Sequence, residues 1–215
     1  MQVLRDIRRL DSTALVLILA NLVPLYGVFA LDWAVFPILF LFWFENVVIG
    51  LFNAARMLSA RPTEPVLWAG KLFLVAFFCV HYGMFTAVHG GLVLSLFGGV
   101  ATEADAMPNP ALVADIIAAE HLALPVLALV ASHGYSFVIN FLLRGEYRSV
   151  SPKALMARPY RRIVLLHVTI LAGGALVTAL DAPVAGLVLL IALKIAMDLQ
   201  SHLRTHAREQ QAPAD

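Results

Sequence analysis

Charged residues are scarce in this chain. They make up 13% of its 215 residues, whereas a soluble domain carries about 25%. This shortage, together with 61% hydrophobic residues, argues against a soluble domain, and no nucleic-acid partner is expected. Cys79 is the single cysteine. It excludes an intrachain disulfide and says nothing about the redox compartment.

Positive charge is also missing from every second segment between the apolar runs. The segments around Asp32, residues 98–120 and Asp181 contain no Lys or Arg. The basic residues are Arg5, Arg8, Arg9, Arg56, Arg61, Lys71, Arg144, Arg148, Lys153, Arg158, Arg161, Arg162, Lys194, Arg204 and Arg208. This alternation follows the positive-inside rule. It predicts a multi-pass protein of the cell inner (cytoplasmic) membrane, with its N- and C-termini in the cytoplasm.

Six apolar runs have the length of a membrane span, about 20 residues each. We therefore expect an all-α, polytopic membrane bundle in which residues 1–215 form one domain. The six transmembrane helices are predicted near 12–31, 33–57, 65–97, 122–143, 163–180 and 184–203. The first run also resembles a signal peptide with a cleavage site at Val28-Phe29-Ala30, but its length favours a retained helix.

The connections contain their own signals. Pro110 suits the first turn of a short interfacial helix near 110–121, and Ser151-Pro152 predicts a short surface helix. That helix would lie in a basic cytoplasmic loop, 144–162, and the tail 205–215 is expected to be flexible. The loop either only orients the protein or also contacts anionic lipid headgroups. Contact would involve Arg148, Lys153, Arg158, Arg161 and Arg162.

Several ionisable side chains fall inside the predicted spans, where each costs on the order of 3 kcal/mol and needs a partner or a role. Counting about 1.5 Å per residue places Glu45, His81, His133 and Lys194 in one layer, about 12–14 Å from the inner face. By the same counting, His167 and Asp198 lie about 6 Å from that face and His202 lies near it. His89 and His121 fall towards the outer face.

Two predicted helices carry polar stripes. Lys194, Asp198 and His202 follow i, i+4, i+8, and the stripe of His133, Ser136 and Asn140 follows i, i+3, i+7. Two such stripes in the inner half of the bilayer predict a shared polar interior. It is either a water cavity open to the cytoplasm or a ligand site.

The ligand interpretation favours a divalent metal, most naturally zinc. The candidate ligands are His81, His133, Asp198 and His202, since imidazole and carboxylate both bind zinc.

Other interpretations of these residues stay open. Asp198 and His202 can instead extend towards headgroups, and Lys194 can serve as a counter-ion. Glu45 is an ion-pair partner, a ligand or a general base. Supporting or alternative ligands are His167, Asn140 and His89, although His89 also suits close helix packing and His167 suits phosphate binding.

Haem is the alternative cofactor. It would need facing histidine pairs, such as His81 with His133 and His89 with His121. The spacings of eight and twelve residues do not match, and there is no Cys-x-x-Cys-His.

Four segments carry a resemblance to known families: Phe42-Trp43-Phe44-Glu45-Asn46, His81-Tyr82-Gly83-Met84-Phe85, Ser132-His133-Gly134-Tyr135-Ser136-Phe137 and Asp198-x-x-x-His202. They resemble those of an uncharacterised bacterial integral-membrane family with a domain of unknown function. More loosely, the layout is similar to that of the intramembrane metallohydrolases that include alkaline ceramidases.

The looser resemblance implies a zinc ion held by three His and an Asp, with a Ser nearby. His81, His133 and His202 would match the histidines, Asp198 the aspartate, and Ser132 or Ser136 the serine. This chain departs from that pattern in having six predicted helices instead of seven, and Asp-x-x-x-His instead of His-x-x-x-His.

The resulting expectation is zinc-assisted hydrolysis of a lipid-derived substrate, with Glu45 as general base, and Lys194 and Ser132 stabilising the oxyanion. The alternatives are a small transporter or proton-relay protein, and a haem- or quinone-binding redox subunit. Small residues such as Gly173-Gly174-Ala175 also permit a homodimer.

Overall fold

The computed structural model describes residues 34–61, 66–99, 108–148, 150–160, 163–164, 167–168, 188 and 191–192. The chain divides into two compact units, and nearly all described residues belong to the unit Phe36–Ile170. Its elements are α3 (Val35–Ser59), α4 (Val66–Phe97), α5 (Pro110–Ala119), α6 (Ala123–Tyr135), η1 (Ser136–Leu143), η2 (Glu146–Arg148) and α7 (Pro152–Ala157). Within these described ranges there is helix and no strand.

Helices α3 and α4 bury stripes with the same spacing. On α3 the buried positions include Leu39, Trp43, Asn46, Gly50, Asn53 and Met57. On α4 they include Val75, Phe78, Tyr82, Thr86, His89 and Val93. Both stripes advance in steps of three or four residues, the seam typical of helices that pack at a small crossing angle. These two long helices therefore provide the framework of the unit.

Three contacts hold the two stripes together. Trp43 Nε1 donates a hydrogen bond to the backbone oxygen of Thr86 at 2.7 Å, and the Tyr82 hydroxyl donates to the backbone oxygen of Asn46 at 3.0 Å. At Gly50, an added Cβ would lie 2.5 Å from Cε1 of Tyr82. Only glycine lets the tyrosine ring lie against the α3 backbone, so the α3–α4 distance depends on this position.

Lys71, near the start of α4, binds the C-terminal end of α3. Its Nζ donates to the backbone oxygens of Leu58 and Ala60, at 2.5 and 2.9 Å, and it lies 4.4 Å from the centroid of the Trp68 ring. The last carbonyls of a helix have no intrahelical donor. Lys71 supplies that donor for α3. This buried lysine therefore has a structural role in addition to its place in the positive-inside charge pattern.

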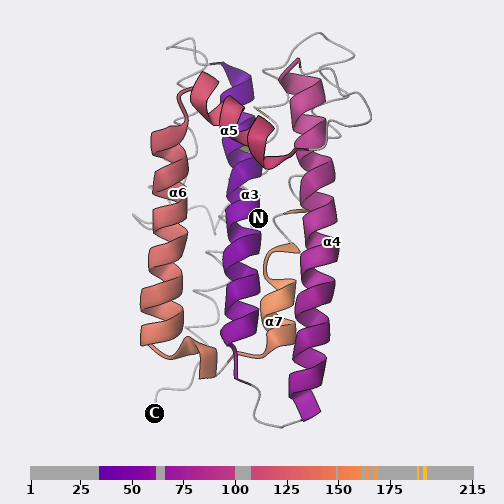
Figure 1. Ribbon diagram of the computed structural model, residues 1–215, viewed down its shortest axis with the longest axis vertical. Helices are drawn as coiled ribbons and strands as arrows, with labels where there is room; N and C mark the ends of the chain where they lie inside the picture. The colour runs from indigo at the N-terminus through magenta and orange to yellow at the C-terminus, as the bar shows by residue number, and fades with distance from the viewer. Residues whose placement is uncertain are drawn as a thin grey trace, which may run out of the picture. The chain divides into compact units, whose positions relative to one another are not determined.

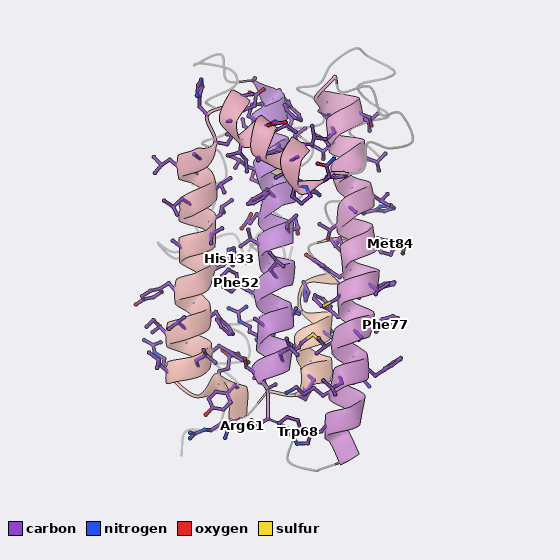
Figure 2. All side chains as sticks on the ribbon, viewed as in Figure 1. Phe52, Arg61, Trp68, Phe77, Met84 and His133 are labelled. Carbon is purple, nitrogen blue, oxygen red and sulfur yellow. The ribbon has the colours of Figure 1, made fainter. Side chains whose placement is uncertain are left out.

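Helix α3 lies between α4 and α6 (Figure 1). On the α6 side, the Phe52 and Phe137 rings are 5.9 Å apart, and Arg56 donates to the Ser136 hydroxyl at 3.2 Å. Figure 2 shows Phe52 and His133 in the space between α3 and α6. Helix α5 crosses the end of the unit, capped by the Asn109 side chain, which accepts from the backbone of Leu112.

The α6 helix continues directly into η1, an eight-residue π-helical segment. A π-helix advances by five residues per hydrogen bond instead of four. The predicted stripe of His133, Ser136 and Asn140 assumed α-helical spacing throughout. The π-helical hydrogen bonding changes that spacing beyond Ser136.

The segment predicted as a surface helix in a basic loop is instead packed into the unit. Helix α7 is capped by Ser151, whose hydroxyl accepts from the backbone of Ala154, as expected. However, Leu155 is fully buried, and its backbone oxygen accepts from Asn53 Nδ2 at 3.0 Å. Figure 1 shows α7 beside α4. Residues 160, 163–164 and 167–168 are also helical, so the chain turns inward at Pro152 instead of near residue 163.

Three described helices are long and apolar enough to cross a membrane: Val35–Ser59, Gly70–Phe97 and Ala123–Leu143. Their bounds agree with the predicted runs 33–57, 65–97 and 122–143. The predicted helix 12–31, most of the predicted helices 163–180 and 184–203, and the tail 205–215 lie outside the described residues. Six spans, cytoplasmic termini and a single domain therefore stay predictions.

We expect Asn53→Ala to destabilise the protein, because it removes the buried hydrogen bond that joins α3 to α7. Hydrogen bonds between helices in membranes are worth about 0.6–2 kcal/mol. Thermal unfolding in detergent should show a lower Tm for this variant than for Asn140→Ala, a matched asparagine in η1. Equal Tm values for the two variants would contradict the role of Asn53.

Candidate functional site

Polar side chains inside the described spans occur as pairs. One pair is formed by His89 on α4, which is buried, and His167, which is exposed, with His89 Nε2 lying 2.8 Å from His167 Nδ1. The ring of His89 is also stacked near Phe85, and its Nδ1 lies 2.5 Å from the backbone oxygen of that residue. His89 is 1% exposed, so both of its ring nitrogens have partners within the protein.

The hydrogen-bond partners assign the tautomers of this pair. A backbone oxygen can only accept, so Nδ1 of His89 carries a hydrogen. In the neutral ring, Nε2 of His89 must then accept, and Nδ1 of His167 must donate. The remaining nitrogen, Nε2 of His167, is an acceptor. The pair can therefore take up one proton at His167 without breaking any of these contacts.

A second pair joins α6 to α3. His133 Nε2 lies 3.6 Å from Glu45 Oε1, and both side chains are partly buried, at 25% and 16% exposure. The separation suits an ion pair better than a direct hydrogen bond. No residue of α6 is completely buried, whereas His89 of the first pair is 1% exposed.

The third pair joins α4 to the segment after α7. His81 Nδ1 lies 2.8 Å from the hydroxyl of Tyr160. The imidazole stacks on Phe77 at 5.1 Å and lies against Phe85. Phe77 points away from α3 in Figure 2. His81 therefore lies on the side of α4 that carries Phe77, with Tyr160 as its polar partner.

The pairing of His89 with His167 overturns the predicted depths of these two histidines. Counting from the sequence placed His89 towards the outer face and His167 about 6 Å from the inner face. The structure brings them into contact. The count failed because it began helix 5 near residue 163, whereas the chain turns inward at Pro152. His167 therefore follows eleven more residues of the inward-running chain than the count assumed, and it reaches His89.

Only two of the four predicted metal ligands, His81 and His133, are among the described residues. His81 has Tyr160 as its partner and His133 has Glu45, so these two histidines do not share a donor set. Asp198 and His202 lie outside the described residues, as does Lys194. Where the structure is described, no three His, Cys, Asp or Glu side chains gather around one point. The described donors thus do not fit a zinc centre by themselves.

The imidazole pair does not have the spacing of two zinc ligands either. With Zn–N distances of about 2.0–2.1 Å and tetrahedral angles, two ligating nitrogens lie about 3.3 Å apart. The observed 2.8 Å is a hydrogen-bond distance. The facing pairs expected for haem are likewise replaced, since His81 and His89 have other partners.

The remaining predicted residues lie apart from these pairs. Ser132 is exposed on α6 and Asn140 is half-buried in η1. Of the predicted lipid-binding cations, Arg158 pairs with Glu146 at 3.0 Å and Lys153 is exposed on α7. Arg161 and Arg162 lie outside the described residues. The residues behind the homodimer prediction, 173–175, lie outside them too.

Tyr147 is the centre of a small basic cluster at the end of the unit. Arg148 Nε donates to its hydroxyl at 3.1 Å, and Arg61 and Arg148 both lie over its ring. The hydrogen bond from Arg148, followed by the two positive charges, lowers the pKa of the Tyr147 phenol. These cations are thus already engaged with an aromatic side chain.

Sequence reasoning missed two participants. One is Tyr160, the partner of His81, and the proline-initiated turn at Ser151-Pro152 was the available signal for its position. The other is Thr86 Oγ1, which is buried and, like Asn46 Oδ1, has no hydrogen-bond partner. No sequence signal distinguishes them from satisfied helix-interior residues.

Comparison with known proteins identifies a family but no activity. No curated protein and no solved structure matches this chain. One family model matches residues 3–215, and its description is "Family of unknown function (DUF6498)". That match covers nearly the whole chain and agrees with the resemblance to an uncharacterised family. The chain belongs to this family of unknown function, DUF6498.

Proposed function

We propose that this protein takes up and passes protons within the membrane, as a proton-relay or proton-coupled transport protein. One observation carries the proposal: the hydrogen bond between Nε2 of His89 and Nδ1 of His167, at 2.8 Å, in which His89 is almost completely buried. Buried ionisable groups inside a span are costly, and proton transfer is one of the functions that retain them.

The geometry allows one balanced transfer. A proton arriving at Nε2 of His167 makes that ring an imidazolium. The ring then gives the hydrogen on its Nδ1 to Nε2 of His89. His167 is left neutral with its hydrogen on Nε2, and His89 becomes the imidazolium. The positive charge is then stabilised by the backbone oxygen of Phe85, which already accepts from Nδ1.

The pair holds one extra proton at a time. Two positive charges on rings in hydrogen-bond contact would repel each other strongly in a low-dielectric setting. The pair therefore acts as a single-proton acceptor that must empty before it refills, which is the behaviour a relay needs. Glu45 with His133, and His81 with Tyr160, supply further titratable pairs in the same unit.

His89→Asn should abolish relay activity, because asparagine cannot accept a proton and return it. The protein would be reconstituted in liposomes containing a pH-sensitive dye, and proton entry would be driven by a potassium diffusion potential. We expect proton entry to be at least about a hundredfold slower for the variant, the lower end of what a positioned proton-transfer group contributes. The control is His121→Asn, at an exposed turn where a left-handed backbone tolerates asparagine.

Wild-type flux equal to that of empty liposomes would reject the relay. Equal flux in wild type and His89→Asn would remove the imidazole pair from the mechanism.

Zinc-assisted lipid hydrolysis is the second candidate. It is favoured by the carboxylate of Glu45 beside His133, since a carboxylate often orients a metal-ligating histidine. Because the described donors do not converge, no catalytic step is derived through a metal.

Elemental analysis of the purified protein and of His133→Ala distinguishes the candidates. The relay proposal expects no bound metal in either protein after metal supplementation. About one zinc ion per chain, lost in His133→Ala, would favour the hydrolase instead. A red-brown colour of the same sample would favour haem. Quinone binding, anionic-lipid contact and a homodimer stay predictions.

A further inference from the structure

A cavity lies between α3 and α4, beneath the first turn of α5. Its volume is about 390 Å³. Residues from both helices line it, including Trp43, Ala54, Cys79, Tyr82, Gly83 and Thr86, and it is bordered at one end by Pro108, Asn109, Pro110 and Val113. Apart from Thr86 and the Tyr82 hydroxyl, the wall that these α3 and α4 residues form is apolar.

We propose that this cavity binds the acyl chain of a single-chain lipid, with Thr86 donating a hydrogen bond to the lipid's ester carbonyl. The site is separate from the three titratable pairs, so the inference goes beyond proton transfer and stands without it.

The length of the cavity matches one leaflet of a bilayer. Its lining on α3 runs from Trp43 to Ala54, eleven residues, or about 16 Å along the helix. Half of a hydrocarbon core of roughly 30 Å is about 15 Å. A chain that enters at the α5 end can therefore lie extended along α3 and stop near mid-membrane.

The volume is consistent with one chain. Ligand pockets range from roughly 300 to 1,000 Å³, and this cavity is at the small end. A single flexible chain fills such a narrow space, whereas a planar ring system such as haem needs a wider one.

Thr86 provides the polar anchor. It is 7% exposed and its Oγ1 has no hydrogen-bond partner, although its backbone oxygen accepts from Trp43. Leaving a buried hydroxyl unpaired costs about 1–3 kcal/mol. An ester carbonyl within the cavity would accept from it and remove that cost. Thr86 lies near the α5 end, where the ester of an inserted lipid would be.

The α5 end also has the features of an interface. Trp43 and the Asn109-capped start of α5 both border the cavity there. Tryptophan and amphipathic helix termini are favoured at headgroup level. The chain therefore enters from the membrane–water boundary that α5 marks, which the charge pattern predicts to be the outer side.

Gly83 leaves space in the α4 wall of the cavity. An added Cβ there would meet no heavy atom within 4 Å, and the same is true of Gly91 further along α4. Gly83 lines the cavity and Gly91 does not. The two positions are therefore a matched pair: leucine at Gly83 fills the cavity, and leucine at Gly91 does not enter it.

The reactivity of Cys79 can report whether the cavity is occupied. Cys79 is the only cysteine of the chain, it is exposed, and it lines the cavity. The experiment measures the rate of Cys79 alkylation by N-ethylmaleimide in the full-length, detergent-purified protein, with and without 1-oleoyl-lysophosphatidylcholine. We expect the lysolipid to slow alkylation at least about fivefold in wild type and in Gly91→Leu. It should have no effect in Gly83→Leu.

Thr86→Val tests the anchor without changing the shape of the side chain. We expect about a five- to tenfold higher lysolipid concentration for half-protection, the loss of one hydrogen bond of about 1–1.5 kcal/mol.

Three results would overturn the proposal. Wild-type alkylation that is unchanged by the lysolipid means that no chain binds. Cys79 that resists alkylation without lipid, but reacts after denaturation, means that another segment of this chain covers the cavity. Protection that persists in Gly83→Leu places the lipid elsewhere. Proton flux measured on Gly83→Leu should stay at the wild-type level, so failure of the relay is distinguishable from failure of the lipid site.

Discussion

The close approach of α4 to α3 at Gly50 is the contact on which the rest of the described unit depends. In a membrane, apolar side chains gain little by leaving lipid for one another, so helices associate through tight packing and hydrogen bonds. Here the Tyr82 ring lies where a Cβ of residue 50 would be, and its hydroxyl reaches the backbone of Asn46. This contact sets the spacing of the two stripes and with it the width of the cavity between them.

The same seam explains where polar groups are tolerated. Asn53 joins α3 to α7 through the backbone of Leu155, and Lys71 supplies donors to the end of α3. His89 continues the α4 stripe and meets His167. Most buried polar groups on the seam thus bond across helices, which specifies one arrangement of the bundle. Thr86 Oγ1 and Asn46 Oδ1 are the exceptions, and exceptions of this kind are informative about ligands.

The helices were readable from the sequence because their signals are local. Run length and capping residues predicted α3, α4, α5 and α6, and the Ser151-Pro152 cap predicted the start of α7. The pairing of polar residues was not readable. It depends on where the chain turns inward, and six cations made residues 144–162 resemble a surface loop. The sequence also gives no cue to the π-helical geometry of η1, so the face of Asn140 could not be assigned.

The length of α4 determines how the protein responds to bilayer thickness. Its 32 residues extend for about 48 Å, well beyond a hydrocarbon core of roughly 30 Å. Typical tilts of up to about 40° absorb only part of the difference. Since α3 is seven residues shorter and is tied to α4 along the seam, α4 cannot tilt independently of it. Bilayer thickness therefore acts on both helices together, and a thicker membrane would match α4 at the expense of α3.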